Sequence, residues 1–342
     1  MNRELNFDSL LFYLEEAFGY PSEKINVSQL PGGYSNLSFL VETPDQRMIL
    51  RRPPFGEKIA KAHDMSREFQ VLSSLKKAGY TKSPSPLLLC EEEDVFGAHF
   101  FVMEYIEGYI LRAKIPDGLH FGAKEFSQLS KNAVEGLLEL HHLELHHSGL
   151  IDLGKPEGYT QRQVLGWTDR YQRAKTHELP ELEETASWLS SHFPKEEPLA
   201  FIHNDYKYDN LVLALNDPTC LHSVLDWEMA TVGNPLMDLG TTLAYWAEAE
   251  DPTLLKQFNL SFLPGNFSRA QLIDYYFSKS KLKQENMIFY YAFGLFKVAV
   301  IAQQIFKRFS QGFASDHRFA KLILVVEAAG KKALQSIHSE KI

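Results

Sequence analysis

The chain has 342 residues, of which 44% are hydrophobic and 23% charged. This balance is typical of a folded protein and excludes a disordered one. A chain of this length usually forms more than one core, so two lobes are expected. The 44 acidic residues outnumber the 35 Lys and Arg, for a formal net charge of −9, and no basic block is present, which disfavours nucleic acid as a partner.

Two features bear on location. The N-terminal residues include acids where a secretion signal needs a positive segment followed by an apolar run, so a cytoplasmic protein is expected. The most apolar stretch, 287–306, is interrupted by Lys297, Gln303 and Gln304, and its longest uncharged run is shorter than the ~18 residues of a membrane span. We therefore expect a buried helix there and no membrane partner.

The first hundred residues show mostly strand patterns. Short β-rich runs occupy 24–30, 36–43 and 47–52, with turn residues between them. Asp64 is a suitable N-cap for a helix that ends near Gly79. Two further strand patterns follow at 87–90 and 99–105, joined by an acidic hairpin. The expected order is β-β-β-α-β-β, starting with three antiparallel strands.

After Gly108 the pattern becomes helical. A strand-rich island interrupts the helices and is followed by more of them; the helical patterns are 124–142, 160–175, 179–192, a helix from about 236, 269–280, 286–309 and 316–337, and the strand patterns are 199–213 and 222–226. The natural boundary lies at the connection 104–108. We therefore expect an α+β protein with lobes 1–105 and 106–342.

The segment 203–210 and the Asp that follows it at 226 carry the clearest chemical signal. The spacing is H-x-D-x-K-x-x-N, then strand, turn, strand and Asp. Asp and Asn oxygens are hard donors of the kind that Mg²⁺ prefers, and the order is that of the catalytic and metal loops of protein-kinase-like phosphotransferases. Any one of these residues alone could be a cap or an Asx-turn. The compound pattern favours phosphoryl transfer.

A second pattern concerns Arg51 and Glu68. Residues alternate between the faces of a strand, so Arg51 shares a face with Ile49, and Arg52 lies on the opposite face. Glu68 falls within an apolar helical stripe, where a carboxylate needs a cationic partner. Arg51 is the candidate. The alternatives are a local pair with Arg67 or a Glu68 side chain that reaches solvent.

Six segments, 30–36, 49–54, 62–69, 101–108, 203–210 and 224–240, carry a resemblance to a known family. The chain resembles the aminoglycoside phosphotransferase and choline kinase-like group, and it looks closest to the kinase-like domain fused to some acyl-CoA dehydrogenases. The resemblance implies a protein-kinase-like fold, with an N-terminal antiparallel sheet and one helix before a larger, mainly helical lobe. It also implies transfer of the γ-phosphoryl group of ATP, or of GTP, with Mg²⁺, to a small-molecule hydroxyl.

The resemblance further implies residue roles. Asp205 would orient or deprotonate the acceptor hydroxyl and Lys207 would contact the transferred phosphoryl group, while Asn210 and Asp226 would hold Mg²⁺. His203 and Asp238 would support the loop. Nucleotide contacts would come from Gly33, Ser35, Asn36, Arg51, Glu68, Met103, Glu104 and Ile106. Arg51 stands where the family has Lys, and the two are not interchangeable; Asn204 replaces the usual Gly. These two departures motivate a second hypothesis, a nucleotide-binding pseudokinase or regulatory module.

The charge distribution bears on the acceptor. Residues 230–342 contain 13 Lys and Arg against 9 Asp and Glu, a net +4, so 1–229 carry −13. A polycationic aminoglycoside or choline would need an acidic pocket wall, whereas the basic segment 230–342 favours a neutral or anionic metabolite such as a hydroxyacyl thioester. An aminoglycoside and choline remain the alternatives. Lys297 and Trp246 are candidate substrate residues. The short loop from Asp226 to Asp238 makes a protein substrate unfavourable, because it offers no activation loop.

Four histidines, at 141, 142, 146 and 147, form a further cluster. His142 and His146 have the i, i+4 spacing of metal ligands on a helix. No H-E-x-x-H frame accompanies them, and packing at the end of the helix is the favoured interpretation.

Overall fold

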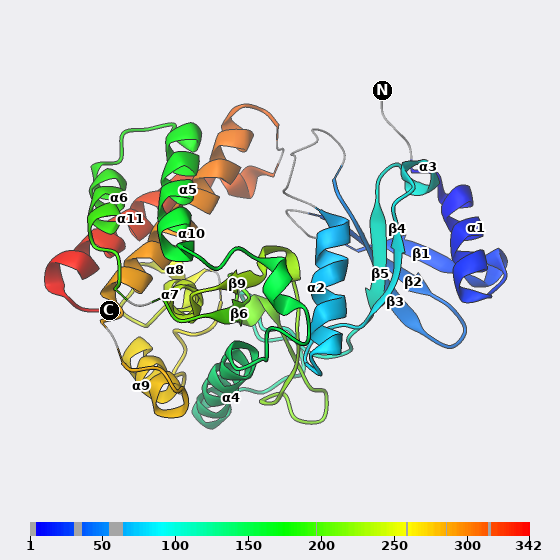
Figure 1. Ribbon diagram of the computed structural model, residues 1–342, viewed down its shortest axis with the longest axis horizontal. Helices are drawn as coiled ribbons and strands as arrows, with labels where there is room; N and C mark the ends of the chain where they lie inside the picture. The colour runs from blue at the N-terminus through cyan, green and yellow to red at the C-terminus, as the bar shows by residue number, and fades with distance from the viewer. Residues whose placement is uncertain are drawn as a thin grey trace. The chain divides into compact units, whose positions relative to one another are not determined.

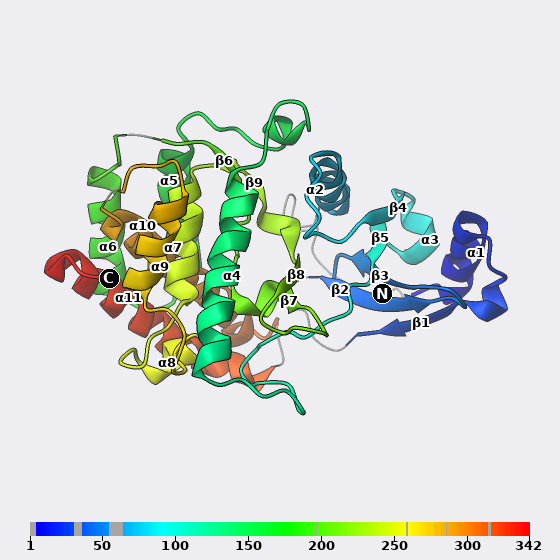
Figure 2. The same ribbon diagram turned by 90° about the horizontal axis from the view of Figure 1, so that it is seen from below.

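The computed structural model describes residues 5–30, 36–54, 64–195, 197–257, 259–284, 286–313 and 316–342 (Figures 1 and 2). The chain divides into two compact units. One comprises Met1–Glu107 together with Ser223–Glu228, and the other Gly108–His222 together with Met229–Ile342. The boundary expected after residue 105 lies two residues from the observed one. Ser223–Glu228 returns to the first unit, where the Val224 N–H donates to the Lys82 carbonyl (2.8 Å).

The first unit is built on a five-stranded antiparallel sheet with strand order β1-β2-β3-β5-β4. Its strands are β1 (Asn26–Gln29), β2 (Leu37–Glu42), β3 (Arg47–Arg52), β4 (Pro86–Cys90) and β5 (Phe100–Glu104). Its helices are α1 (Phe7–Phe18), α2 (Met65–Lys77) and α3 (Glu93–Phe96), with a 3₁₀ turn at Ser22–Lys24. The antiparallel start predicted from sequence is confirmed.

Two of these helices were not expected. The predicted order β-β-β-α-β-β omits α1, which Asn6 caps through Ser9 and which buries Leu10 and Leu14, one turn apart, in the core of the sheet. It also omits α3, which occupies the acidic segment expected to be a plain hairpin. Acidic residues in a first helical turn are favourable near the positive end of the helix dipole, and Gly97 ends this helix with φ of 77°.

The alternation of side chains along β3 is as predicted. Leu50 belongs to the core cluster that packs under α1, and Arg52 on the same face donates to the carbonyl of Phe96 (2.8 Å). Arg51 points to the other face, where α2 presents Glu68. The two helices therefore cover opposite faces of the sheet, as Figure 1 shows, and the two arginines have different surroundings.

The second unit is mainly helical. Two short two-stranded sheets pair β6 (Ala200–Ile202) with β9 (Thr231–Gly233) and β7 (Leu211–Leu213) with β8 (Leu221–Val224), whose last two residues already belong to the first unit. Strand β9 was not predicted. The helices are α4 (Ala123–His141), α5 (Tyr159–Ala174), α6 (Pro180–Ser191), α7 (Pro235–Tyr245), α8 (Thr253–Lys256), α9 (Arg269–Lys279), α10 (Ile288–Ser310) and α11 (Leu322–Ser339). The 3₁₀ turns of this unit are Leu150–Leu153, Tyr208–Asn210 and His317–Lys321, and a further turn, Trp227–Met229, begins in the first unit.

Helix α10 forms the centre of this unit. By length and composition it could cross a membrane, but 83% of its most apolar window is buried inside the structure, as expected for a core helix. It lies beside α7 (Figures 1 and 2). The two backbones approach so closely that a Cβ on Gly294 would lie 2.3 Å from the carbonyl oxygen of Gly240. This contact fixes the neighbouring residues of both helices, among them Asp238 and Lys297.

Candidate active site

The loop after β6 contains the first group of predicted site residues, and Asp238 holds its backbone. The two carboxylate oxygens of Asp238 accept the N–H groups of His203 and Asn204, each at 2.7 Å. Asn204 has φ of 67°, in the left-handed region that favours glycine. The support predicted from Asp238 is thus a direct backbone contact.

Asp205, Lys207 and Asn210 meet within this loop. The Lys207 ammonium lies 2.7 Å from Oδ2 of Asp205, and the amide nitrogen of Asn210 donates to the same oxygen and to the Asp205 carbonyl, both at 2.9 Å. The Asp205 N–H donates to Nδ1 of His203 (3.2 Å), so His203 contacts the backbone of the loop directly. One carboxylate oxygen is therefore fixed by a cation and an amide.

Behind the loop, His141 continues the network. Its Nε2 lies 3.2 Å from Asp238 and its Nδ1 lies 2.8 Å from the hydroxyl of Tyr276. Burial opposes the ionised form of Asp238, but the bond to His141 and the surrounding donors outweigh it and hold the pKa of Asp238 below its ordinary value. Among the residues that the structure describes, no group of three or more His, Cys, Asp or Glu could hold a metal ion. His141 is therefore a buried side chain with both ring nitrogens engaged, and the packing interpretation of the whole histidine cluster stays a prediction.

Within the first unit, Arg51 is surrounded by three carboxylates. Its Nη1 lies 2.6 Å from Glu68, and its Nη2 lies 3.2 Å from Asp226 and 3.9 Å from Glu228. Burial alone would lower the pKa of Arg51, but these carboxylates outweigh it and raise the pKa above its ordinary value. The predicted pairing of Arg51 with Glu68 is confirmed, and the alternatives for Glu68, Arg67 or solvent, are wrong.

Glu68 is only 2% exposed, and one of its oxygens has no hydrogen-bond partner among the described residues. Burial raises the pKa of Glu68 to about 7, against the opposing effect of Arg51. The nearby charges of Asp226 and Glu228 act in the same direction as burial. The carboxyl is thus held close to the point where it gains a proton at neutral pH.

Glu228 is the residue that sequence reasoning missed. It accepts a hydrogen bond from the amide of Asn36 (3.0 Å), so a predicted nucleotide residue is tied to it. The signal was present, since Glu228 lies two positions after Asp226 in an Asp-Trp-Glu segment. Asp226 itself has φ of 68°, and the indole of Trp227 between the two acids is buried, donating to the Val224 carbonyl at 2.8 Å.

The remaining nucleotide candidates have different outcomes. Gly33 and Ser35 lie outside the described residues. Met103 is buried at the end of β5, and the connection to Ile106 follows it. The N–H of Glu104 already donates to the Ser85 carbonyl (2.9 Å), and the base contacts of Glu104 and Ile106 stay a prediction.

The two substrate candidates, Lys297 and Trp246, are both buried with their polar atoms satisfied. The Lys297 ammonium lies 2.6 Å from the Asn204 carbonyl, and the Trp246 indole N–H donates to the Phe267 carbonyl (2.7 Å). The structure gives neither side chain an exposed polar atom for a substrate, because each polar atom is buried and bonded to a backbone carbonyl, which for Lys297 belongs to the loop after β6.

Each unit contains oxygen donors of the kind that a hard divalent cation prefers. Three carboxylates face one guanidinium around Arg51, which leaves a surplus of negative charge when all three are ionised. In the other unit, Asn210 uses its amide nitrogen for both hydrogen bonds to Asp205, and neither bond uses its amide oxygen. Carboxylate and amide oxygens are the ligands of Mg²⁺.

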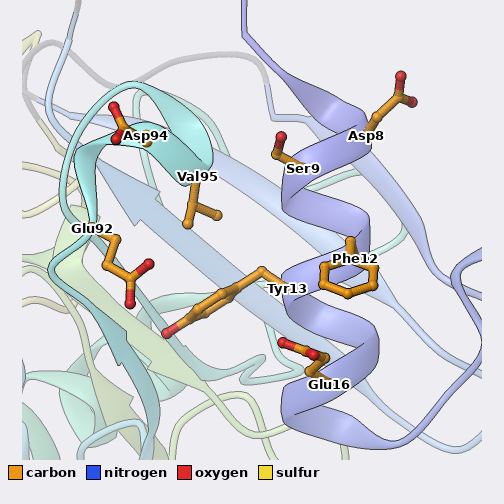
Figure 3. A pocket seen from close by; sticks show the side chains of 8 residues that line it. All are labelled: Asp8, Ser9, Phe12, Tyr13, Glu16, Glu92, Asp94 and Val95. Atoms are coloured by element: carbon orange, nitrogen blue, oxygen red, sulfur yellow. The ribbon is translucent and has the colours of Figure 1, made fainter.

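A shallow hollow of about 520 Å³ lies elsewhere, between α1 and α3 (Figure 3). Phe12 and Tyr13 line it together with the acidic residues Asp8, Glu16, Glu92 and Asp94. Burial, with smaller effects of Cys90 and Glu92, raises the pKa of Tyr13 to about 12. The hollow is on the α1 side of the sheet, whereas Arg51 faces α2, so it is separate from the candidate site.

The sheet with its paired Arg and Glu, and the braced loop bearing Asp, Lys and Asn, define a phosphotransferase of the protein-kinase-like class. Residues 26–273 match the model of the phosphotransferase enzyme family, and the chain belongs to that family. The fold class and the family resemblance expected from sequence are both confirmed.

Known proteins agree with this assignment. The chain is 34% identical over 313 residues to acyl-CoA dehydrogenase family member 11 of Gallus gallus, which covers 89% of this chain and 40% of that protein. The chain thus spans less than half the length of this relative. A crystal structure from Ralstonia eutropha JMP134, described as an aminoglycoside phosphotransferase, has a TM-score of 0.81 and 26% identity, covering 98% of this chain and 99% of that one. Choline kinase from Cryptosporidium parvum shares the fold, with a TM-score of 0.63 and 14% identity over 98% and 99%.

Proposed function

We propose that the protein transfers the γ-phosphoryl group of a nucleoside triphosphate, ATP first, to the hydroxyl of a small molecule. The observation that carries the proposal is the held carboxylate of Asp205, with Lys207 at 2.7 Å and Asn210 at 2.9 Å from one oxygen. Family membership supports the reaction class. Both lines of support are independent of the acceptor.

In this proposal Asp205 orients the acceptor hydroxyl and takes its proton as the reaction proceeds. The acceptor oxygen forms a bond to the γ-phosphorus, and the bond from that phosphorus to the β–γ bridging oxygen breaks, so the nucleoside diphosphate leaves with the electron pair. Lys207, which lies beside Asp205, would contact the transferred phosphoryl group. Its ammonium also lies 4.6 Å from the ring centre of Tyr245. Positioning and charge stabilisation would supply most of the catalysis.

Mg²⁺ would be held by Asn210 and Asp226, with Glu228 as an additional nearby carboxylate. When bound, the ion neutralises charge that develops on the phosphate oxygens. Arg51 already contacts Asp226, and its fork of donors suits the α- and β-phosphates. Glu68 would hold Arg51 in place for that contact. Met103, Glu104 and Ile106 would meet the base.

For the acceptor we propose a neutral or anionic hydroxylated metabolite, with a hydroxyacyl thioester as the leading example. Two observations support it: the net +4 of residues 230–342, and the similarity to proteins that bear an acyl-CoA dehydrogenase name. An aminoglycoside or choline is the alternative class, because proteins with those names share the fold.

The test is ADP release from ATP over a panel of hydroxyacyl-CoA thioesters, choline and kanamycin. Asp205→Asn should lose at least 100-fold in kcat with the productive acceptor, whereas Asp217→Asn, in an exposed turn, should match the wild type. Equal rates for Asp205→Asn and the wild type would overturn the assigned mechanism. Nucleotide binding without turnover or Mg²⁺ dependence would instead favour the pseudokinase alternative.

A further inference from the structure

Lys297 is a buried cation in an otherwise apolar stretch of α10. It is 1% exposed, and the residues on both sides of it, from Ile288 to Ala299, are all buried. Burial lowers the pKa of Lys297 to about 8; Asp205 and Asp238 oppose this effect, and Lys207 and Arg170 add to it. A Met or Leu would pack here without a desolvation cost, so packing alone does not account for a Lys.

The contact of Lys297 is specific. Its ammonium donates to the carbonyl of Asn204 at 2.6 Å and lies 5.6 Å from the ring centre of Trp167. Helices α7 and α10 cross closely at Gly240 and Gly294, and Lys297 lies about one helical turn after Gly294 in α10. Asp238 reaches the same loop from α7. Two buried charges of opposite sign therefore converge on one short segment of backbone.

The atom that Lys297 holds belongs to the peptide that joins Asn204 to Asp205. A peptide is planar, so its carbonyl and its N–H are fixed together. The carbonyl is bound by Lys297, and the N–H of Asp205 is bound by His203 at 3.2 Å. Because Asn204 has φ of 67°, a conformation that is costly without support, loss of the carbonyl contact would let this plane rotate and would turn Asp205.

We propose that Lys297 is a positioning residue for phosphoryl transfer, which acts by holding the Asn204 carbonyl and so fixing the direction of Asp205. The proposal rests on the function proposed above for Asp205. It replaces the role of Lys297 as a substrate contact, because the ammonium is already engaged inside the core.

The test compares Lys297→Met with a matched variant on the same helix, Lys307→Met. Lys307 also donates to a backbone carbonyl at 2.6 Å, that of Arg173, but in an exposed place. In Lys297→Met the amides of 203–205 should exchange hydrogen at least tenfold faster than in the wild type. Its kcat should fall at least tenfold, with KM for ATP within threefold. Lys307→Met should change neither quantity.

The exchange measurement needs no acceptor and no turnover. If the wild type transfers no phosphoryl group to any acceptor, the proposed function fails while the role of Lys297 in holding the loop is still decided. Unchanged exchange at 203–205 in a folded Lys297→Met would overturn the proposal, as would a kcat within twofold of the wild type. Should Lys297→Met fail to fold, Lys297→Gln, which lacks the charge, is judged by the same two readouts.

Discussion

The buried pair of Arg51 and Glu68 allows a test of whether burial or ion pairing sets the pKa of the Glu68 carboxyl. Burial raises the pKa of Glu68 from its ordinary 4.5 to about 7. At about 1.36 kcal/mol per unit, this corresponds to roughly 3 kcal/mol. Because the folded state binds the proton more tightly than the unfolded state, this stabilisation is present below pH 4.5 and is lost as the pH rises to 7.

Glu68→Gln removes this titration while keeping the shape of the side chain. Relative to the variant, the wild type should therefore lose about 3 kcal/mol of unfolding free energy between pH 4.5 and 7.5. The measurement is urea denaturation at several pH values, with unfolding monitored by pulsed hydrogen exchange in peptides that cover β3 and α2. The difference between the two proteins cancels the titration of all other groups.

Glu107→Gln is the matched control. Glu107 pairs with Arg47 at 2.8 Å, but its side chain is 58% exposed, and such pairs contribute only about 0.2–1 kcal/mol. The control should show no comparable step. A wild type that instead gains stability from pH 4.5 to 7.5 relative to Glu68→Gln would refute the reasoning, because it would mean that Arg51 keeps Glu68 ionised and its pKa below the ordinary value.

Three further outcomes are expected. The ammonium of an Arg51→Lys variant cannot bond Glu68 and Asp226 with one fork, so Asp226 loses a charged hydrogen bond of about 1.5 kcal/mol and is freed to bind a metal. The affinity for Mn²⁺ in the presence of ADP, measured by electron paramagnetic resonance, should therefore rise roughly tenfold. An unchanged affinity would contradict this reasoning. Asp238→Asn should lower the unfolding free energy by about 3–5 kcal/mol, since it breaks a buried charged network, and a urea-measured loss below about 1 kcal/mol would show that the loop does not depend on the charge. Gly294→Ala should lower the unfolding free energy by about 1–3 kcal/mol or more, because the added methyl group overpacks against α7. Gly166→Ala, in a helix with open space around the added methyl group, should leave stability unchanged or raise it. Equal melting temperatures for the two variants would contradict the close crossing.

The sequence was sufficient for much of the fold because the signals involved are local. Turn residues separate the strand patterns of the first sheet, and Asp64 caps α2 as its position predicts. Helix α3 was missed because its four residues are too few for a periodic pattern. Helix α1 was missed although the sequence holds its signals, the Asn6 N-cap and the spacing of Leu10 and Leu14. The short strand β9 was missed because its three residues become a strand only by pairing with β6.

For the site, the sequence by itself determined the residue types and their spacing in 203–210 and at Asp226, and the parity of β3 assigned Arg51 to the face of α2. The tertiary structure decided which groups touch. It added Glu228 to the surroundings of Arg51, returned Ser223–Glu228 to the first unit, and turned Lys297 from a substrate candidate into a contact of the Asn204 carbonyl. The physical reason is that a pattern fixes the face of a strand or helix, whereas the partner of a buried charge depends on how distant segments pack.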